Sequence, residues 1–253
     1  MLQFALLIVI GFFVGLFVIS MGGGGGAIYL GVLTAVFNLA PASAAATSIV
    51  TALPSLAIGS WLYYRQGQIN FHLGNTMLIS AIPSVIIGAL IAPFIPTKLY
   101  NLIIGLILFV LGVQVLYKLK ANSRTQNPHS SKVLPLIFGA ISGLMVGVAG
   151  LSGGGPITAG LLLMGASMIQ ASATSSYVLI CMSIIGALTH LSGGQIDWSV
   201  GICLMAGSII GAAIAPKLMK KFAVGNGAVV LKVIMGVLLI FMGIKTFLKS
   251  SRR

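Results

Sequence analysis

The sequence of 253 residues contains one acidic residue, Asp197, and only 6% of its residues are charged. An ordinary soluble domain has about 25% charged residues, so this chain has too few to cover a water-facing surface. None of its long apolar runs contains Asp or Glu, whereas coupled cation carriers and proton relays usually keep such a residue inside the membrane. A cation substrate is therefore disfavoured, and an anion would meet no repelling carboxylate.

Cysteine is also scarce, and Cys181 and Cys203 both lie inside apolar segments without metal-ligand spacing. They are typical of small buried residues. A Ser–His–Asp set would have to use Asp197, and the segment around Ser152 differs from the Gly-x-Ser-x-Gly nucleophile elbow. We therefore expect no enzyme activity, no metal and no cofactor.

Hydrophobic residues make up 58% of the chain and form runs at 2–20, 69–94, 99–117, 133–151 and 229–247. Each run approaches or exceeds the roughly 18–20 residues that span a bilayer core. Helices bond all of their backbone polar groups internally, so we predict an all-α, polytopic transmembrane bundle. The net charge of +13 comes mainly from Lys and Arg between or after the runs. This pattern is typical of membrane orientation and not of nucleic-acid binding.

The sequence also repeats itself in one consistent order. Matched segments are 46–48 with 173–175, 67–70 with 194–197, 88–93 with 211–216, and the glycine runs 22–26 with 153–155. Duplication is common in transporters, where the substrate site lies at the interface of the repeats. We predict a first transmembrane repeat at 1–118, a basic connecting loop at 119–132 and a second repeat at 133–253.

Each repeat is expected to hold four long helices, with a short helix after the glycine-broken first one. The expected ranges are 2–20, 27–37 (short), 44–64, 71–94 and 98–117, then 133–151, 157–165 (short), 171–191, 198–217 and 227–249. The short helices cannot span a bilayer alone, so the number of crossings stays open. Four crossings per half would give both halves one orientation, and an odd number would invert one half.

The basic residues favour one orientation if each half crosses four times. One side then holds Arg65, Lys118, Lys120, Arg124, Lys132, Lys249, Arg252 and Arg253, and the other holds Lys98, Lys217, Lys220 and Lys221. Since cytoplasmic loops carry an excess of Lys and Arg, both termini are predicted to lie in the cytoplasm. The expected location is the cytoplasmic (inner) membrane.

The glycine runs are the strongest candidates for a substrate site. They comprise Gly22, Gly23, Gly24, Gly25 and Gly26 after Ser20, and Gly153, Gly154 and Gly155 after Ser152. Glycine in a helix costs about 1 kcal/mol relative to alanine, so the runs should unwind the first helices. The short helices would then present free N–H groups and a positive dipole end to an anion. The alternative is that these glycines serve close packing or a hinge.

Hydroxyl residues follow both short helices, with Thr47 and Ser48 in the first half and Thr174 and Ser175 in the second. They could bind an oxyanion directly, or bond back to helix carbonyls as is common in membrane helices. Arg65 is a candidate for attracting anions to the cytoplasmic mouth of the pathway.

Together, the glycine-rich break, the following Ala-Thr-Ser, the later Gly-Gln-Ile-Asn/Asp and their duplication resemble the sulfite exporter TauE/SafE family of membrane transporters. The resemblance covers nearly the whole chain. It implies a multi-pass transporter with about eight helices that exports, or in some members takes up, sulfite, sulfonates and related organic anions. It does not identify the substrate of this member.

We therefore expect a secondary carrier for a small anion such as sulfite or an organic sulfonate. Export is favoured, because an inside-negative potential drives anions outward by about 2.3 kcal/mol per charge at 100 mV. Two alternatives stay open: a non-transporting assembly subunit of a membrane complex, and a channel-like pore. The expected partners are the anionic substrate and the lipid bilayer, with a homo-oligomer as a further possibility.

Overall fold

The computed structural model describes residues 2–20, 26–120, 133–150, 153–191 and 196–222, with isolated positions between 233 and 248. Throughout this described part the regular structure is helical, which confirms the all-α prediction. The elements are α1 Leu2–Ser20, α2 Gly26–Ala35, α3 Pro41–Arg65, α4 Phe71–Ile91, the 3-10 turn η1 Ala92–Phe94, α5 Thr97–Lys120, α6 Val133–Ala149, α7 Gly154–Leu163, α8 Met168–Leu191 and α9 Trp198–Phe222.

Local sequence explains where several helices begin. Pro41 occupies the first turn of α3, where its missing N–H removes no helix bond. The Asn70 side chain caps α4 by accepting a hydrogen bond from the Leu73 N–H at 3.1 Å. Asp197 caps α9 in the same way, with its carboxylate accepting from the Val200 N–H at 3.2 Å.

Most predicted helix bounds agree with the structure to within a few residues. The largest difference is at α9, which ends at Phe222 and not at 217, and the starts of α3 and α7 also differ, since these helices begin at Pro41 and Gly154 and not at 44 and 157. The prediction that 153–155 forms an unwound stretch was therefore wrong for Gly154 and Gly155, which lie in the first turn of α7. The helix expected at 227–249 lies mostly outside the described residues.

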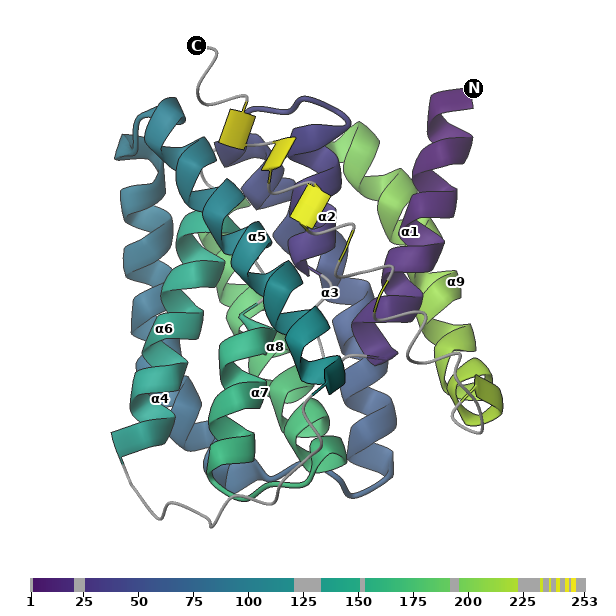
Figure 1. Cartoon of the computed structure of the whole chain (residues 1–253), viewed down its shortest axis with the longest axis vertical. Coiled ribbons are helices and arrows are strands. Elements are labelled where there is room, and N and C mark those ends of the chain that lie inside the picture. The colour runs from purple at the N-terminus through teal and green to yellow at the C-terminus, as the bar shows by residue number, and fades with distance from the viewer. Residues whose placement is uncertain are drawn as a thin grey trace.

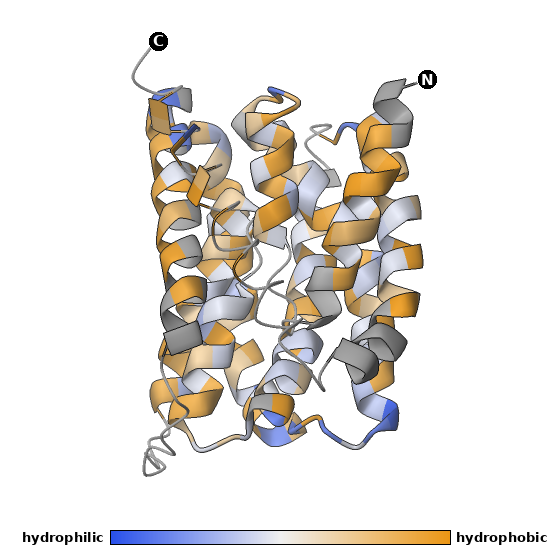
Figure 2. Ribbon diagram, turned by 45° about the vertical axis from the view of Figure 1, so that its right-hand side comes forward, coloured by the Kyte–Doolittle hydropathy of each residue, from blue (hydrophilic) through white to orange (hydrophobic). Residues whose placement is uncertain are grey.

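Three of the described helices are long and apolar enough to cross a membrane: Ala42–Arg65, Phe71–Phe94 and Ile169–Thr189. The outer face of Phe71–Phe94 is apolar, with Ile79, Leu90 and Phe94 exposed by 70%, 63% and 85% of their surface. Figure 2 shows apolar residues along the helices and the most hydrophilic ones at the two ends of the bundle. Such a band suits contact with lipid chains, and it would be unfavourable in water.

Glycines bring two pairs of helices into close contact (Figure 1). On α1, a methyl group added to Gly11 or Gly15 would collide with the backbone carbonyl of Leu204 or Ser208 on α9. On α6, the same holds for Gly143 and Gly147, which lie against the Ala81 and Val85 carbonyls of α4. Small residues of this kind allow membrane helices to approach closely. Each pair joins the first helix of one half to the third helix of the other.

These contacts also fix the directions of the helices. In both pairs, successive contacts join residues whose sequence positions rise together along the two helices. Therefore α1 is parallel to α9 and α6 is parallel to α4. The start of α9, at Gly201, lies against Thr47 near the start of α3, which makes α3 parallel to α9 as well. Gly186, near the end of α8, contacts Ile49 near the start of α3, so α8 is antiparallel to α3.

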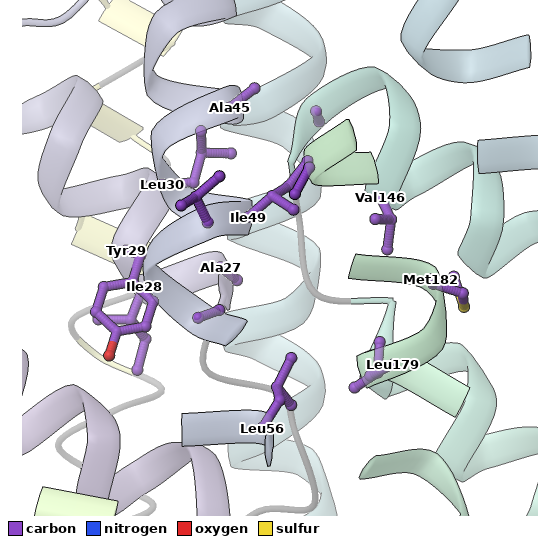
Figure 3. Close-up of a cluster of buried hydrophobic side chains, with 14 of the residues drawn as sticks. Ala27, Ile28, Tyr29, Leu30, Ala45, Ile49, Leu56, Val146, Leu179 and Met182 are labelled. Carbon is purple, nitrogen blue, oxygen red and sulfur yellow. The ribbon is translucent and has the colours of Figure 1, made fainter. Parts of the chain in front are cut away.

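Accordingly, α1, α3 and α9 run in one direction and α4, α6 and α8 in the other. The short helix α2 returns the chain from the end of α1 to the start of α3, and α7 does the same between α6 and α8 (Figure 1). The core lies where α3 and α8 pack together with these short helices. Figure 3 shows part of it, where Leu30 of α2 and Ile49 of α3 face Val146 of α6 and Leu179 of α8.

Candidate substrate site

The interior of the bundle is polar only through uncharged groups. Apart from Asn101, the buried polar side chains of the described residues are hydroxyls: Thr34, Thr47, Ser48, Thr51, Ser55, Ser142, Thr174, Ser175, Ser176, Ser183 and Ser208. An anion inside this interior would find hydrogen-bond donors and no opposing negative charge among the described residues.

The helix break in the second half lies in this interior. After α6 ends at Ala149, Gly150 adopts a left-handed φ of 62° and is buried. A side chain at Gly150 would collide with the Ala45 backbone of α3. The Ser48 hydroxyl lies 2.8 Å from both the Gly150 carbonyl and the Ala45 carbonyl, and donates to them. The break is therefore held against the first turns of α3.

The far end of the same break lies against two other helices. Gly153 is the N-cap residue of α7, and its carbonyl accepts a hydrogen bond from the Ser142 hydroxyl of α6 at 2.8 Å. The Ser175 hydroxyl of α8 reaches the Gly154 carbonyl at 3.5 Å. Because α3 and α8 are antiparallel, Ser48 and Ser175 approach the break from opposite directions.

Two helix N-termini therefore begin inside the protein. Gly154 is buried at the start of α7, and Pro156 in the same turn has no N–H, so Gly154 and Gly155 supply the first amide donors there. Gly26 is buried at the start of α2. An N-terminal end of this kind favours negative charge. The side chains of Ser20 and Ser152, and Gly22, Gly23, Gly24 and Gly25, lie outside the described residues.

Thr47 and Thr174 are both fully buried, and each binds the backbone of the other half. The Asp197 N–H donates to Thr47 Oγ1 at 3.0 Å, and the Asn70 N–H donates to Thr174 Oγ1 at 2.9 Å. Each pair is related to the other by the same shift of 127 positions along the chain. Thr47 thus connects the start of α3 to the N-cap of α9, and Thr174 connects the start of α8 to the N-cap of α4.

Arg65 is exposed at the end of α3, so its side chain is available to attract anions from solution. Cys181 and Cys203 are free thiols, each half-buried. The sequence did not point to several of the buried polar groups. Tyr29 on α2, Ser55 on α3 and Ser208 on α9 are all fully buried, and Ser142 supports the break. A tyrosine in a ten-residue apolar helix was the one signal that could have pointed to them.

Comparison with known proteins identifies the family to which the chain belongs. The family model for the sulfite exporter TauE/SafE matches residues 7–246 of the chain. The chain belongs to the TauE/SafE family. The resemblance drawn from the duplicated motifs is therefore confirmed.

Several relatives of this TauE/SafE chain carry names of the form "probable membrane transporter protein". YdhB of Bacillus subtilis is 25% identical over 244 residues, which cover 93% of this chain and 100% of YdhB. YunE of the same organism is 24% identical over 272 residues, which cover 96% and 99% of the two chains. A Haemophilus influenzae relative is 26% identical over 216 residues, which cover 85% and 84%. No solved structure matches the chain.

The TauE/SafE membership and the apolar helices together make the protein a membrane-embedded transporter. A transporter of this family acts on a small molecule, so the buried hydroxyls and helix ends are the part of the fold in which to seek its site.

Proposed function

We propose that the protein is a secondary carrier that exports a small oxyanion, such as sulfite or an organic sulfonate, across the cytoplasmic membrane. The observation that carries this proposal is the buried break between α6 and α7. It opens a helix N-terminus between Ser48 and Ser175, in an interior whose described polar groups are uncharged. Donors without a neutralising cation would bind an anion weakly enough to release it.

The binding residues follow from the same geometry. Gly153, Gly154 and Gly155 supply backbone at the start of α7, and Gly26 does so at the start of α2. Ser48 and Ser175 lie beside the break, and each hydroxyl could turn from its carbonyl partner to a substrate. Ser20, Gly22, Gly23, Gly24, Gly25, Ser152, Thr47 and Thr174 remain predicted members of the site.

The two halves are proposed to be inverted repeats, spanning 1–118 and 133–253. The reciprocal threonine bonds and the crossed helix pairs α1–α9 and α4–α6 support this symmetry. The first helices of the two halves, α1 and α6, run in opposite directions. This supports an odd number of passes per half, with α2 and α7 as returning segments.

Inversion also bears on the orientation in the membrane. The return through α2 puts the N-terminus and the segment joining α5 to α6 at opposite ends of the bundle. Arg65, Lys118, Lys120, Arg124, Lys132, Lys217, Lys220 and Lys221 then belong to the end that holds this joining segment. Lys98 belongs to the other end, as do Lys249, Arg252 and Arg253 if the expected helix 227–249 makes the last crossing. By the positive-inside rule we propose that the joining segment is cytoplasmic and that the N-terminus faces outward. Compared with four crossings per half, the joining segment stays cytoplasmic, whereas the N-terminus moves to the outside.

The membrane potential sets the direction of net transport. Moving one negative charge outward through 100 mV yields about 2.3 kcal/mol, so an uncoupled anion carrier exports. Coupled uptake would need a site for a driving cation, and the described interior contains no carboxylate for one.

Counterflow of labelled sulfite in proteoliposomes, with methanesulfonate as a competitor, tests the function. We expect saturable exchange that Gly154→Leu abolishes, because a side chain would block the amides at the start of α7. Gly186→Ala is the matched control, since its added methyl group would lie at an ordinary 3.4 Å from Ile49. Absence of flux for any small anion in the wild type would refute the carrier.

The two alternatives give different results. Ion conductance in planar bilayers without saturating exchange would indicate a channel-like pore. Constant comigration with a different protein on a native gel, again without flux, would indicate an assembly subunit.

A further inference from the structure

Three hydroxyls from distant parts of the chain meet inside the bundle, where α2 and α9 both pack against α3. Tyr29 lies on α2, Ser55 on α3 and Ser208 on α9, and none of the three side chains is exposed to solvent. The Tyr29 hydroxyl lies close to the hydroxyls of both serines and interacts with each of them, although without a hydrogen bond of normal geometry. We refer to these three residues as the hydroxyl cluster.

Two members of the hydroxyl cluster are unsatisfied. Ser208 donates to the Met205 carbonyl of its own helix at 2.9 Å. Within the described part of the chain, however, Tyr29 Oη and Ser55 Oγ have no hydrogen-bond partner of normal geometry. Buried polar groups are nearly always bonded, and an unmet donor lowers stability. Tyr29 Oη and Ser55 Oγ therefore have only weak contacts with each other and with Ser208 among the described residues, and both can donate to a stronger acceptor.

The fold itself does not require hydroxyls at these places. Tyr29 and Ile157 are each the fourth residue of their short helix. Ser55 corresponds to Met182 by the shift of 127, and Ser208 to Val85 by the shift of 123 that relates 88–93 to 211–216. Ile157, Met182 and Val85 are fully buried and apolar. The second half thus fills the same positions without polar groups.

The hydroxyl cluster also lies near a helix N-terminus. Side chains of helical residues lean toward the start of their helix, so Tyr29 leans toward the buried Gly26 and Ala27 at the start of α2. In Figure 3 the Tyr29 oxygen points away from Leu30 and Ile49. The unmet hydroxyls and the positive end of α2 therefore lie in the same part of the bundle.

We propose that the hydroxyl cluster is an oxyanion subsite of the transport pathway, which receives a sulfonate or sulfite group. Tyr29 Oη–H and Ser55 Oγ–H each donate a hydrogen bond to an oxygen of the anion, and Ser208 packs beside them. The start of α2 adds its dipole. The subsite rests on the proposed anion transport, and it makes substrate binding asymmetric, because the second half has only apolar groups at the corresponding positions.

Tyr29→Phe and Ser55→Ala test this subsite in the purified full-length protein, with sulfite and methanesulfonate as probes. A hydrogen bond to a charged group is worth about 10-fold or more in affinity. We expect each variant to weaken the anion-dependent thermal shift and raise the KM of counterflow by about 10-fold. Without anion, the melting temperature should stay unchanged or rise, since an unmet buried hydroxyl has been removed. If the hydroxyls had a purely structural role, their removal would lower the melting temperature without anion and leave the anion affinity unchanged.

Thr34→Val is the matched control on the same helix, because the Thr34 hydroxyl is buried but already donates to the Leu30 carbonyl at 2.7 Å. It should leave both anion affinities unchanged. If the wild type binds anions and both Tyr29→Phe and Ser55→Ala bind them with the same affinity as the wild type, the subsite alone is overturned. Lower anion-free stability of both variants would also overturn it. A wild type that neither binds nor exchanges anions would remove the transport function as well.

Discussion

The side-chain oxygen of Thr47 accepts a hydrogen bond from the backbone N–H of Asp197 at 3.0 Å, across 150 positions of the chain. Thr174 and Asn70 make the corresponding bond at 2.9 Å. Asn70 and Asp197 are themselves the N-cap residues of α4 and α9. Each half therefore anchors the start of the other half's third helix, so the halves are not separate units but interlock.

Removing the Thr47 hydroxyl should measurably destabilise the protein. In Thr47→Val the partly buried Asp197 N–H loses its acceptor, which costs about 1 kcal/mol, the low end of the range for buried groups. For a domain of this size each 1 kcal/mol lowers the melting temperature by about 2–4 °C. Thermal unfolding in detergent would measure it, and Thr174→Val should behave alike. Thr47→Ser keeps the oxygen and should restore stability.

Thr51→Val is the control for this loss. The Thr51 hydroxyl is equally buried, but it donates to the Thr47 carbonyl one turn earlier in its own helix. Its removal leaves no N–H without an acceptor, so the change should be small. Equal destabilisation by Thr47→Val and Thr51→Val would mean that the cross-half bond adds nothing.

The sequence predicted the helices well, because apolar runs in lipid have little choice but to be helical. It also placed the repeat motifs, and the Thr and Asn/Asp members of those motifs do contact each other. It could not predict that each contact crosses between halves, since a matched motif gives no pairing partner. Ser55 and Ser208 were missed because a lone serine in a membrane helix usually bonds to its own backbone, as Ser208 does.

The glycines between α4 and α6 should not tolerate even a methyl group. In Gly147→Ala the new carbon would collide with the Val85 carbonyl, which is backbone and cannot rotate away. Overpacking of this kind costs about 1–3 kcal/mol or more. We expect a lower melting temperature and less monodisperse protein in size-exclusion chromatography.

Gly186→Ala provides the comparison, because its added carbon would lie 3.4 Å from a flexible Ile49 methyl group. Alanine is the better helix former by about 1 kcal/mol, so this variant should be neutral or more stable. If Gly147→Ala were as stable as Gly186→Ala, the close approach of α4 and α6 would not exist in the membrane.

Gly150 and Gly67 share a left-handed backbone but differ in their surroundings. Their φ angles are 62° and 65°. Alanine in this conformation costs about 1–2 kcal/mol at either position. Gly67 has nothing within 4 Å of an added carbon, whereas Gly150 would collide with the Ala45 backbone. Gly67→Ala should therefore transport normally, and Gly150→Ala should lose counterflow because the break between α6 and α7 is displaced. Equal counterflow in the two variants would contradict the proposed role of the break.

The return of the chain through α2 predicts on which side of the membrane the N-terminus and each end of α3 lie. Because α1 and α3 are parallel, a cysteine placed before Met1 should lie on the same side of the membrane as Ala40→Cys, just before α3. Gln66→Cys, just after α3, should lie on the opposite side, in the cytoplasm. Both substituted positions are exposed at the ends of α3.

Labelling of intact cells with a membrane-impermeant maleimide would measure this sidedness, in a background where Cys181 and Cys203 are replaced by alanine. We expect the cysteine before Met1 and the one at position 40 to react, and the one at position 66 to react only after the membrane is opened. If the cysteine before Met1 behaved like the one at 66, α1 and α2 would together cross the membrane once. The halves would then share one orientation, and the inverted repeat would be wrong.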